Sequence, residues 1–255
     1  MQLSVLGCSG TVPAATGGCS AYLLRHDGFT VLIEVGTGAV SALLRRGGAD
    51  GRRLPAIDAV FVSHLHADHW IDLVPLSYVR HYQPGGPGAP VAVHAPPAAR
   101  DQLVAAGGWP VEGEHALHTD WRFVDTATGR REIGPFTVDL APVVHPEVCH
   151  ASRWTAGGRS LVFSGDTGAC DALVDLARGA DVGLFEASWY DADDPPPDVH
   201  LTARQAAEHA NRSGVGRLLL THVTPWGDLA RTEAEAAGVA EMPAAAVRTG
   251  EAYEV

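Results

Sequence analysis

The stretch VSHLHADHW, residues 62–70, places three histidines and one aspartate within six positions, directly after a run of β-forming residues. His64 and His66 are two residues apart at the end of this predicted strand, so we expect their side chains to point to the same side. Asp68 and His69 follow where the chain turns into a predicted helix. One short loop thus presents four candidate metal ligands to one place.

Three further candidate ligands follow predicted strands later in the chain. His145 ends LAPVVH, Asp166 ends LVFSGD and His222 ends RLLLTH. In α/β sheets, ligands and catalytic groups gather at the carboxyl ends of strands. Imidazole and carboxylate groups suit Zn²⁺ and related divalent ions. Seven ligands exceed what one tetrahedral ion needs, and they suit two ions that share a bridging carboxylate.

Composition indicates one globular domain spanning residues 1–255. The chain is 46% hydrophobic and 19% charged, and no apolar run reaches the roughly 18 residues that a bilayer crossing needs. The first residues show no basic segment followed by a long apolar one, so we expect a cytoplasmic protein without a membrane partner. The net charge of −12 argues against broad nucleic-acid binding. The four cysteines show no CxxC spacing, which disfavours a disulfide framework.

Hydrophobic periodicity predicts strands that alternate with helices in the second half of the chain. A capping-box pattern, Thr202 followed by Gln205, marks the start of the last predicted helix. No linker or repeat divides the chain, so we predict one α/β domain, and periodicity alone leaves a doubly wound sheet and a barrel open. The predicted strands cover residues 2–7, 21–25, 30–35, 59–63, 91–95, 136–144, 160–166, 182–187 and 217–223, and the helices 38–46, 71–82, 170–179 and 202–214.

The motifs SHLHADHW, VVH, FSGDTG and LLLTHV, in this order, resemble those of the metallo-β-lactamase-fold hydrolases. The resemblance covers nearly the whole chain, from LGCSGTVP to the final strand. It implies an αββα sandwich with a dinuclear metal site at one edge of the two sheets. It also implies two divalent ions per chain, with Zn²⁺ expected and Mn²⁺ or Fe²⁺ as alternatives, and a shared water that is deprotonated to hydroxide.

Carried over residue by residue, the resemblance assigns each ion its ligands. His64, His66 and His145 would hold the first ion, Asp68, His69 and His222 the second, and Asp166 would bridge them. One departure is Glu34 in IEVGTG, where many members of the family have an aspartate. That position usually supports a ligand instead of binding metal, so the change puts the fine positioning of the ligands in question.

A finer resemblance lies in DVHLTARQAAEHANRSGVGRLLLTHV, which is similar to the ribonuclease Z branch. There, a histidine matching His200 contacts the scissile phosphate, and an acidic residue matching Glu186 orients it. An imidazolium held by a carboxylate can protonate a leaving alkoxide, so His200 and Glu186 are candidate catalytic groups. Asp68, one of the candidate ligands, is the third candidate catalytic residue. The tRNA-processing members carry an arm between the metal histidine and the bridging aspartate. Here that interval is 166 − 145 = 21 residues, which leaves no room for the arm, and tRNA is a disfavoured partner.

Armless relatives include bacterial proteins that act on cyclic nucleotides, and GCSG, RHYQP and FSGDTGACDALVDLARGADV are similar to that group. The resemblance implies hydrolysis of a 3′,5′-cyclic nucleotide or another small anionic phosphodiester. It also implies a homodimer, for which the apolar stretch at 69–82 could supply the interface. The candidate substrate-binding residues are Arg80, His81, Tyr82 and Arg153.

Three alternatives stay open at the level of sequence. One is a hydrolase of a non-phosphate bond, such as a lactone, a thioester or a β-lactam. Another is an accessory or binding protein that retains the metal site, and the last is a ribonuclease Z-type endonuclease. His200 argues against the first, and an intact set of seven ligands argues against the second.

Overall fold

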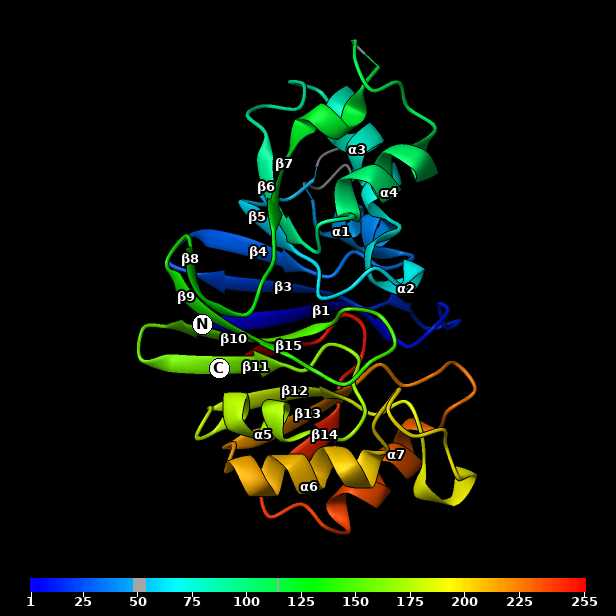
Figure 1. The fold of residues 1–255 in the computed structure, drawn as a ribbon, viewed down its shortest axis with the longest axis vertical. Helices are drawn as coiled ribbons and strands as arrows, with labels where there is room; N and C mark the ends of the chain where they lie inside the picture. Colours follow the sequence, from blue (N-terminus) through cyan, green and yellow to red (C-terminus); the bar gives the residue numbers. More distant parts are fainter. Residues whose placement is uncertain (48–53, 114) are drawn as a thin grey trace.

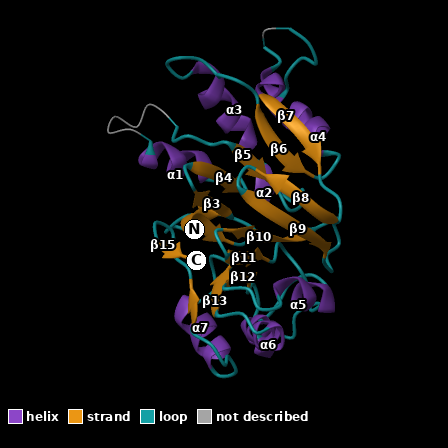
Figure 2. Cartoon of the chain, turned by 90° about the vertical axis from the view of Figure 1, so that its left-hand side faces the viewer, coloured by secondary structure: helices purple, strands orange, loops and turns teal. Residues whose placement is uncertain are grey.

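Two mixed β-sheets pack face to face, and helices cover both outer faces (Figures 1 and 2). The computed structural model describes residues 1–47, 54–113 and 115–255. This arrangement is the αββα sandwich of the metallo-β-lactamase fold, as the resemblance implied, and it rules out a single doubly wound sheet or a barrel. In the part of the chain that the structure describes, no helix combines the length and the hydrophobicity that a bilayer crossing requires.

The first sheet combines an antiparallel half with a parallel half. Strands β1, β3 and β4 pair antiparallel, whereas β4, β5, β6 and β7 run parallel. In spatial order the strands are β15 (Ala252–Glu254), β1 (Gln2–Ser9), β3 (Ala21–His26), β4 (Phe29–Ile33), β5 (Ala59–Phe61), β6 (Val91–Ala95) and β7 (Trp121–Asp125), with β2 (Gly18–Cys19) beside β1.

The second sheet is built in the same mixed way. Strands β8 to β11 pair antiparallel, and β11 to β14 run parallel. In spatial order the strands are β14 (Ala244–Ala246), β13 (Arg217–Thr221), β12 (Val182–Glu186), β11 (Arg159–Phe163), β10 (His150–Ala156), β9 (Phe136–Pro142) and β8 (Gly129–Ile133). The loops after β11, β12 and β13 therefore leave the same edge of this sheet.

Each outer face has its own set of helices (Figure 1). The first sheet carries α1 (Ala39–Arg46), α2 (Ala67–Trp70), α3 (Leu73–Tyr82), α4 (Ala99–Gly107) and the 3₁₀ turn η1 (Leu117–Asp120). The second carries α5 (Asp171–Ala177), α6 (Ala203–Ser213) and α7 (Leu229–Ala237), with the 3₁₀ turn η2 (Asp191–Asp193) nearby.

Aromatic side chains fill the layer between the sheets. The Trp154 ring of β10 lies edge-on to Phe61 of β5, with centroids 5.5 Å apart, and to Phe136 of β9, at 5.7 Å. All three side chains are almost wholly buried. Rings in such tilted and edge-on contacts contribute beyond their buried area, so this layer holds the two sheets in a defined alignment.

Helix α6 confirms the capping box and shows why the helix can approach its sheet closely. Thr202 accepts a hydrogen bond from the Gln205 backbone N–H at 3.1 Å, and the Gln205 side chain accepts one from the Thr202 N–H at 3.0 Å. Its buried face consists of small side chains at helical spacing, namely Ala203, Ala206, Ala207 and Ala210. The helix start is thereby set next to the loop that carries His200.

The structure corrects the local prediction for the histidine-rich stretch. Strand β5 ends at Phe61, two residues earlier than predicted, and α2 begins at Ala67, before the predicted start. The Val62 N–H still bonds to the His94 carbonyl at 2.8 Å, after which the chain leaves the sheet. His64 and His66 thus lie in a loop, and that loop, not strand alternation, sets where their side chains point. Helices α4 and α7 and the strands β7, β8, β10, β14 and β15 were not predicted.

Candidate metal centre

All seven predicted ligands meet at one edge of the sandwich, in helix α2 and in loops that follow β5, β9, β11 and β13. Their ligand atoms form two groups in which every atom lies within 4.8 Å of the others, and a third such group combines Asp166 and His222 with His200. One group holds His64, His66, His145 and Asp166, and the other holds Asp68, His69 and His222. These are the two sets that the resemblance implied, and loops from both sheets contribute to each.

Asp166 stands between the two groups. Its Oδ2 lies 3.7 Å from His64 Nε2 in one group, and 3.3 Å from His69 Nε2 in the other. It also lies 3.4 Å from His222 Nε2. The side chain is 2% exposed. Its position is therefore that of a carboxylate able to bridge two cations, as predicted.

The imidazoles are oriented through their other nitrogen atoms. His69 Nδ1 lies 3.0 Å from Glu34 Oε2, and His145 Nδ1 lies 3.0 Å from the Val199 carbonyl oxygen. Both partners accept hydrogen bonds only, so each Nδ1 carries the hydrogen, and each Nε2 presents a bare lone pair to the cluster. Partners of this kind are typical of histidines that bind metal.

The remaining contacts inside the cluster need a proton or a cation between the two nitrogen atoms. His145 Nε2 lies 3.1 Å from His66 Nδ1, and His69 Nε2 lies 3.2 Å from His222 Nε2. Two lone pairs at such distances repel each other unless a proton or a cation lies between them. His64 Nε2 is buried and has no hydrogen-bond partner in the described part of the chain. The donor set therefore fits divalent ions such as Zn²⁺, which take imidazole and carboxylate ligands.

The pKa directions agree with a demand for positive charge. Burial alone would lower the pKa of His69, yet Asp166 and Asp68 beside it raise the pKa well above its usual range. Burial alone would raise the pKa of the Asp166 carboxyl, but His222 and His69 hold it well below its usual range. The carboxylates thus stay ionised in a buried setting, where ion pairing or metal coordination compensates their charge.

Glu34, the departure from the family pattern, has a defined place in the structure. Its carboxylate is fully buried, accepts the Ser63 N–H at 2.8 Å and contacts His69 Nδ1 at 3.0 Å. Ser63 Oγ in turn lies 3.0 Å from His64 Nδ1. One carboxylate thereby orients a ligand of each group. The longer side chain does not leave the ligands unsupported.

The backbone at the site is strained in several places. Thr11, Glu34 and His222 adopt left-handed conformations, with φ of 66°, 59° and 58°, which non-glycine residues rarely adopt. Gly10, in the segment GCSG, lies so close that a Cβ there would stand 2.5 Å from the His222 carbonyl oxygen. The next residue, Thr11, donates its N–H to Asp68 Oδ2 at 2.8 Å. The first loop of the chain therefore closes tightly on the ligands of the second group.

The predicted pair of His200 and Glu186 is present beside the cluster. His200 Nδ1 lies 2.9 Å from Glu186 Oε1, and Glu186 is 1% exposed. Glu186 also accepts the Thr167 N–H at 2.7 Å and the Ser188 hydroxyl at 2.8 Å. Burial alone would lower the pKa of His200, but Glu186 raises it, to about 9. The Glu186 carboxylate therefore favours the protonated form of this imidazole.

Ser188 is a site residue that sequence reasoning missed. Its hydroxyl lies 2.8 Å from His222 Nδ1 and donates to Glu186, so it connects a ligand of the second group to the His200 pair. A serine next to a strand end carries no distinguishing signal in sequence. Ser63 and the backbone N–H of Thr11 were missed for the same reason.

The four predicted substrate-binding residues make their contacts elsewhere. In α3, Arg80 lies over the Trp121 ring, 5.4 Å from its centroid, and His81 Nδ1 lies 3.0 Å from Asp120. Tyr82 is 62% exposed. Arg153 donates to the backbone carbonyls at the end of α5, at 2.8 and 3.0 Å. None of the four belongs to the ligand groups, and their contacts lend no support to the predicted role.

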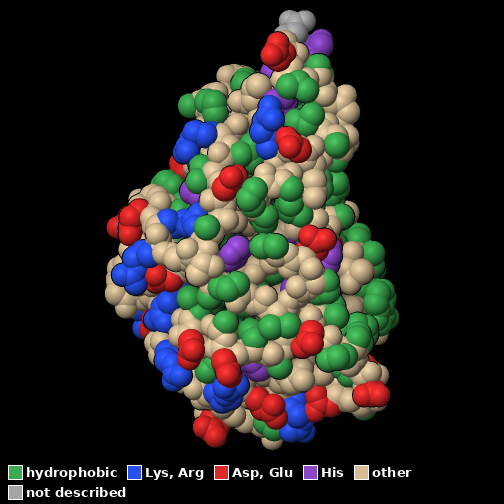
Figure 3. Space-filling view, in the orientation of Figure 1, with side chains coloured by type: hydrophobic (Ala, Val, Ile, Leu, Met, Phe, Trp, Pro, Cys, Tyr) green, Lys and Arg blue, Asp and Glu red, His purple; other side chains and the backbone are tan. Residues whose placement is uncertain are grey.

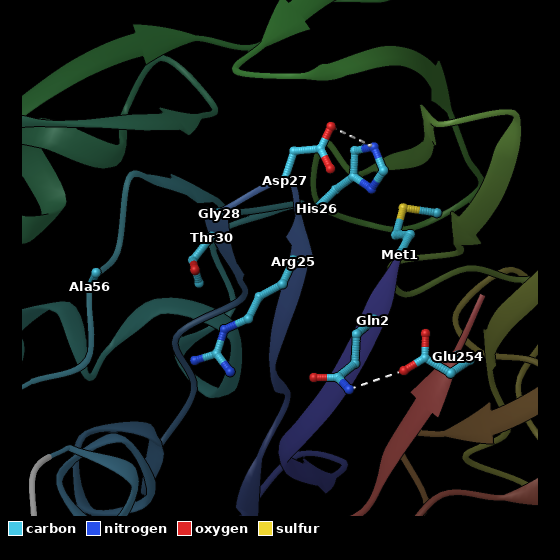
Figure 4. A pocket seen from close by; sticks show the side chains of 9 residues that line it. All are labelled: Met1, Gln2, Arg25, His26, Asp27, Gly28, Thr30, Ala56 and Glu254. Atoms are coloured by element: carbon cyan, nitrogen blue, oxygen red, sulfur yellow. Dashed lines mark hydrogen bonds and ion pairs between the residues drawn. The ribbon is translucent and has the colours of Figure 1, made fainter.

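The face seen in Figure 3 shows histidine side chains at mid-height, where the two halves of the molecule meet, with hydrophobic side chains around them. A separate cavity of about 490 Å³ lies at the opposite ends of the strands, where β3 turns into β4. Arg25, Thr30 and Glu254 are among its lining residues (Figure 4). It contains none of the seven predicted ligands, so the cluster remains the candidate active site.

Comparisons with known proteins agree with this geometry. The profile of the family described as "Beta-lactamase superfamily domain" matches residues 30–223. The chain is 39% identical over 263 residues to the uncharacterized protein Rv1339 of Mycobacterium tuberculosis, covering 100% of this chain and 92% of the relative. It is 29% identical over 265 residues to ribonuclease Z of Mycobacterium bovis, covering 91% and 92%.

The solved structure of YhfI from Bacillus subtilis, a metallo-β-lactamase-fold protein, superposes with a TM-score of 0.85 at 25% identity, and covers 99% of both chains. In sequence, YhfI bears the name "Probable metallo-hydrolase" and is 28% identical over 255 residues, covering 92% of this chain and 93% of its own. The likeness extends over both sheets and all the loops that carry the cluster.

Proposed function

The chain belongs to the β-lactamase superfamily, and from that premise we propose that it is a metal-dependent hydrolase of small phosphodiesters, with a 3′,5′-cyclic nucleotide as its substrate. The coarser part, a metal-dependent hydrolase, rests on the family, on the histidine–aspartate cluster and on the likeness to YhfI. The finer part rests on one observation, the pairing of His200 with the buried carboxylate of Glu186 beside the cluster.

The cluster and the pair have separate roles in this proposal. Two divalent ions, when bound by the seven ligands, lower the pKa of water and neutralise charge on the oxygens of a phosphoryl group. His200 supplies what such ions do not, a proton for the leaving oxygen. Its ring lies between those of His145 and His222, with centroids 5.7 and 5.3 Å away. Because Nδ1 is committed to Glu186, Nε2 is the atom that would deliver the proton.

Shape and charge favour a small substrate over a folded RNA. The interval between His145 and Asp166 is occupied by the β10–β11 hairpin, which turns at Gly157 and Gly158. There is no arm at this place in the fold. The net charge of −12 disfavours a polyanion such as tRNA. The relationship to ribonuclease Z nonetheless supports chemistry on a phosphodiester bond.

The test is turnover by the zinc-loaded protein on a substrate panel. The panel holds cyclic AMP, cyclic GMP, bis-p-nitrophenyl phosphate, a lactone and a thioester. We expect hydrolysis of the cyclic nucleotides to the monophosphates. Turnover of the lactone or thioester with no turnover of any phosphodiester would contradict the proposal and would favour the alternative of a non-phosphate hydrolase.

A variant separates the proton donor from the ligands. His200→Ala should keep its metal content, and should lower turnover of a cyclic nucleotide by roughly 10²–10⁴-fold, the usual scale for general acid catalysis. Its effect on bis-p-nitrophenyl phosphate should be much smaller, because p-nitrophenolate needs little protonation. Asp166→Ala should lose metal and both activities. Equal losses for His200→Ala on the two substrates would show that His200 positions phosphate or supports the fold.

A further inference from the structure

A group of basic side chains occupies the layer between the sheets, next to the candidate metal centre. His94 of β6, Arg131 of β8 and His150 of β10 all stand at inward-facing positions. His94 pairs in register with Phe61, and Arg131 pairs with Val138, and both of these partners belong to the core between the sheets. His150 alternates with Ser152 and Trp154 on the same inner side of β10. These three side chains thus replace core hydrophobics at one edge of the sandwich.

Backbone contacts tie this group to the metal-binding loop. The His94 carbonyl accepts the Val62 N–H at 2.8 Å, and the His150 N–H donates to the Ser63 carbonyl at 3.3 Å. Both contacts stand directly before His64. A fourth polar residue, Thr126, belongs to the same edge, where the chain crosses from β7 to β8, because its N–H donates to the Ala95 carbonyl at 2.9 Å.

The group contains buried polar atoms that have no partner. His94 Nδ1, His150 Nδ1, Thr126 Oγ1 and Arg131 Nε are all buried, and none of them makes a hydrogen bond within the described chain. His94 is 9% exposed, His150 6% and Thr126 6%. Buried polar atoms are nearly always satisfied, by protein, water or ligand, because leaving one unpaired costs roughly 1–3 kcal/mol. Four such atoms at one place therefore indicate that something else binds there.

The charge of the group points to the kind of ligand. The Arg131 guanidinium donates only to the carbonyl oxygens of Asp125 and Ala127, and none of the ion pairs among the described residues includes it. Burial, together with the charges of Arg131 and Arg122, lowers the pKa of His94 to about 4. Burial and Arg131 likewise lower the pKa of His150. The site thus offers the positive charge of Arg131 beside two imidazoles whose neutral forms are favoured.

We propose that this edge of the sandwich binds a tetrahedral oxyanion of the phosphate class, held by Arg131, His94, His150 and Thr126. The planar fork of arginine suits phosphate oxygens, and imidazole and hydroxyl groups can donate to the others. A cation is excluded by the guanidinium. Arg131 is half-exposed, which gives an ion a path from solvent. The site contains none of the seven predicted ligands, and the proposal does not depend on the reaction proposed for them.

The test compares two adjacent arginines in the zinc-loaded protein. Arg130 is exposed and forms an ion pair with Asp139 at 2.8 Å, so Arg130→Gln is a matched control for Arg131→Gln. Melting temperature is measured against inorganic phosphate at constant ionic strength. With phosphate at ten times its dissociation constant, wild type and Arg130→Gln should melt roughly 3–5 °C higher than without it. Arg131→Gln should lose most of this rise.

Phosphate that binds at the metal ions adds an equal shift to all three proteins, so the difference between the two variants reports the proposed site. His150→Gln provides a second variant, should Arg131→Gln not fold. Crystals grown with selenate supply an independent readout, because its anomalous signal locates the anion. Equal shifts for the variants of Arg130 and Arg131, or water alone beside Arg131 in the selenate crystals, would overturn the proposal.

Discussion

Replacement of Glu34 by glutamine should selectively weaken the second metal site. The Glu34 carboxylate accepts a hydrogen bond at each oxygen, from the Ser63 N–H at 2.8 Å and from His69 Nδ1 at 3.0 Å. Glutamine keeps only one accepting oxygen. If that oxygen stays with Ser63, the amide NH₂ faces His69 Nδ1, which must then give up its hydrogen.

The consequence for His69 follows from its two tautomers. With Nδ1 as the acceptor, the hydrogen moves to Nε2, the atom that lies 3.3 Å from Asp166 Oδ2 and faces the cluster. A protonated Nε2 cannot bind a cation. Changes to partners that orient metal ligands typically cost 10–100-fold in affinity, which corresponds to about 1.4–2.8 kcal/mol. We expect a loss of this size for the ion held by Asp68, His69 and His222.

The assay is competition for Zn²⁺ against a chromophoric chelator, which resolves two binding steps. For Glu34→Gln, the weaker step should shift by roughly 10–100-fold, while the step assigned to His64, His66 and His145 should change less. Glu132→Gln is the control, because Glu132 is exposed, belongs to neither ligand group and accepts a hydrogen bond from the Thr137 hydroxyl at 3.1 Å. If the Glu34→Gln protein is folded by circular dichroism and binds both Zn²⁺ ions with wild-type affinity, the proposed change in the His69 tautomer is refuted.

Three more predictions concern metal content, assembly and stability. Elemental analysis of gently purified protein should approach two divalent ions per chain, and a value that stays near zero after reconstitution with Zn²⁺ or Mn²⁺ would rule out the dinuclear site. Light scattering at tens of micromolar protein should give twice the chain mass of 26.7 kDa, as expected of a homodimer that uses residues 69–82, including α3, as its interface. The mass of one chain would count against the homodimer. Thr202→Ala should cost about 1–2 kcal/mol of unfolding free energy through loss of the α6 cap, whereas Thr202→Ser, which keeps the hydroxyl, should cost less in thermal unfolding.

The sequence by itself was sufficient to predict which seven side chains gather at the cluster and, through the resemblance to a known family, the class of fold. HxHxDH is a local motif, so its four ligands are close in space whatever the rest of the chain does. His145, Asp166 and His222 each follow a β-rich run, and strands of an α/β fold deliver such residues to a common edge. The cap of α6 was predictable for the same local reason, since Thr202 and Gln205 are three residues apart.

Tertiary structure alone decided how these ligands are supported. Glu34 meets His69 across 35 residues of chain, and Ser188 meets His222 across 34. No local pattern encodes such contacts, because they depend on how the loops of different strands are placed. Arg80 and Arg153 show the converse. Arg80 donates to the Ala89 carbonyl and Arg153 to the Arg178 carbonyl, and neither contact could be read from the motifs near them in sequence.

The basic group at the sandwich edge shows most clearly which features the sequence predicts and which depend on tertiary structure. These residues, His94, Arg131 and His150, come from three strands of two sheets. None of them belongs to a sequence motif within its own strand. Strand periodicity tells only that each side chain faces one side or the other. When the two sheets pack together, the inner faces of these strands face each other. Only then does the Arg131 guanidinium come close to the unpaired polar atoms of His94 and His150. The sequence specifies the chemistry of each residue, and the closure of the sandwich decides which residues act together.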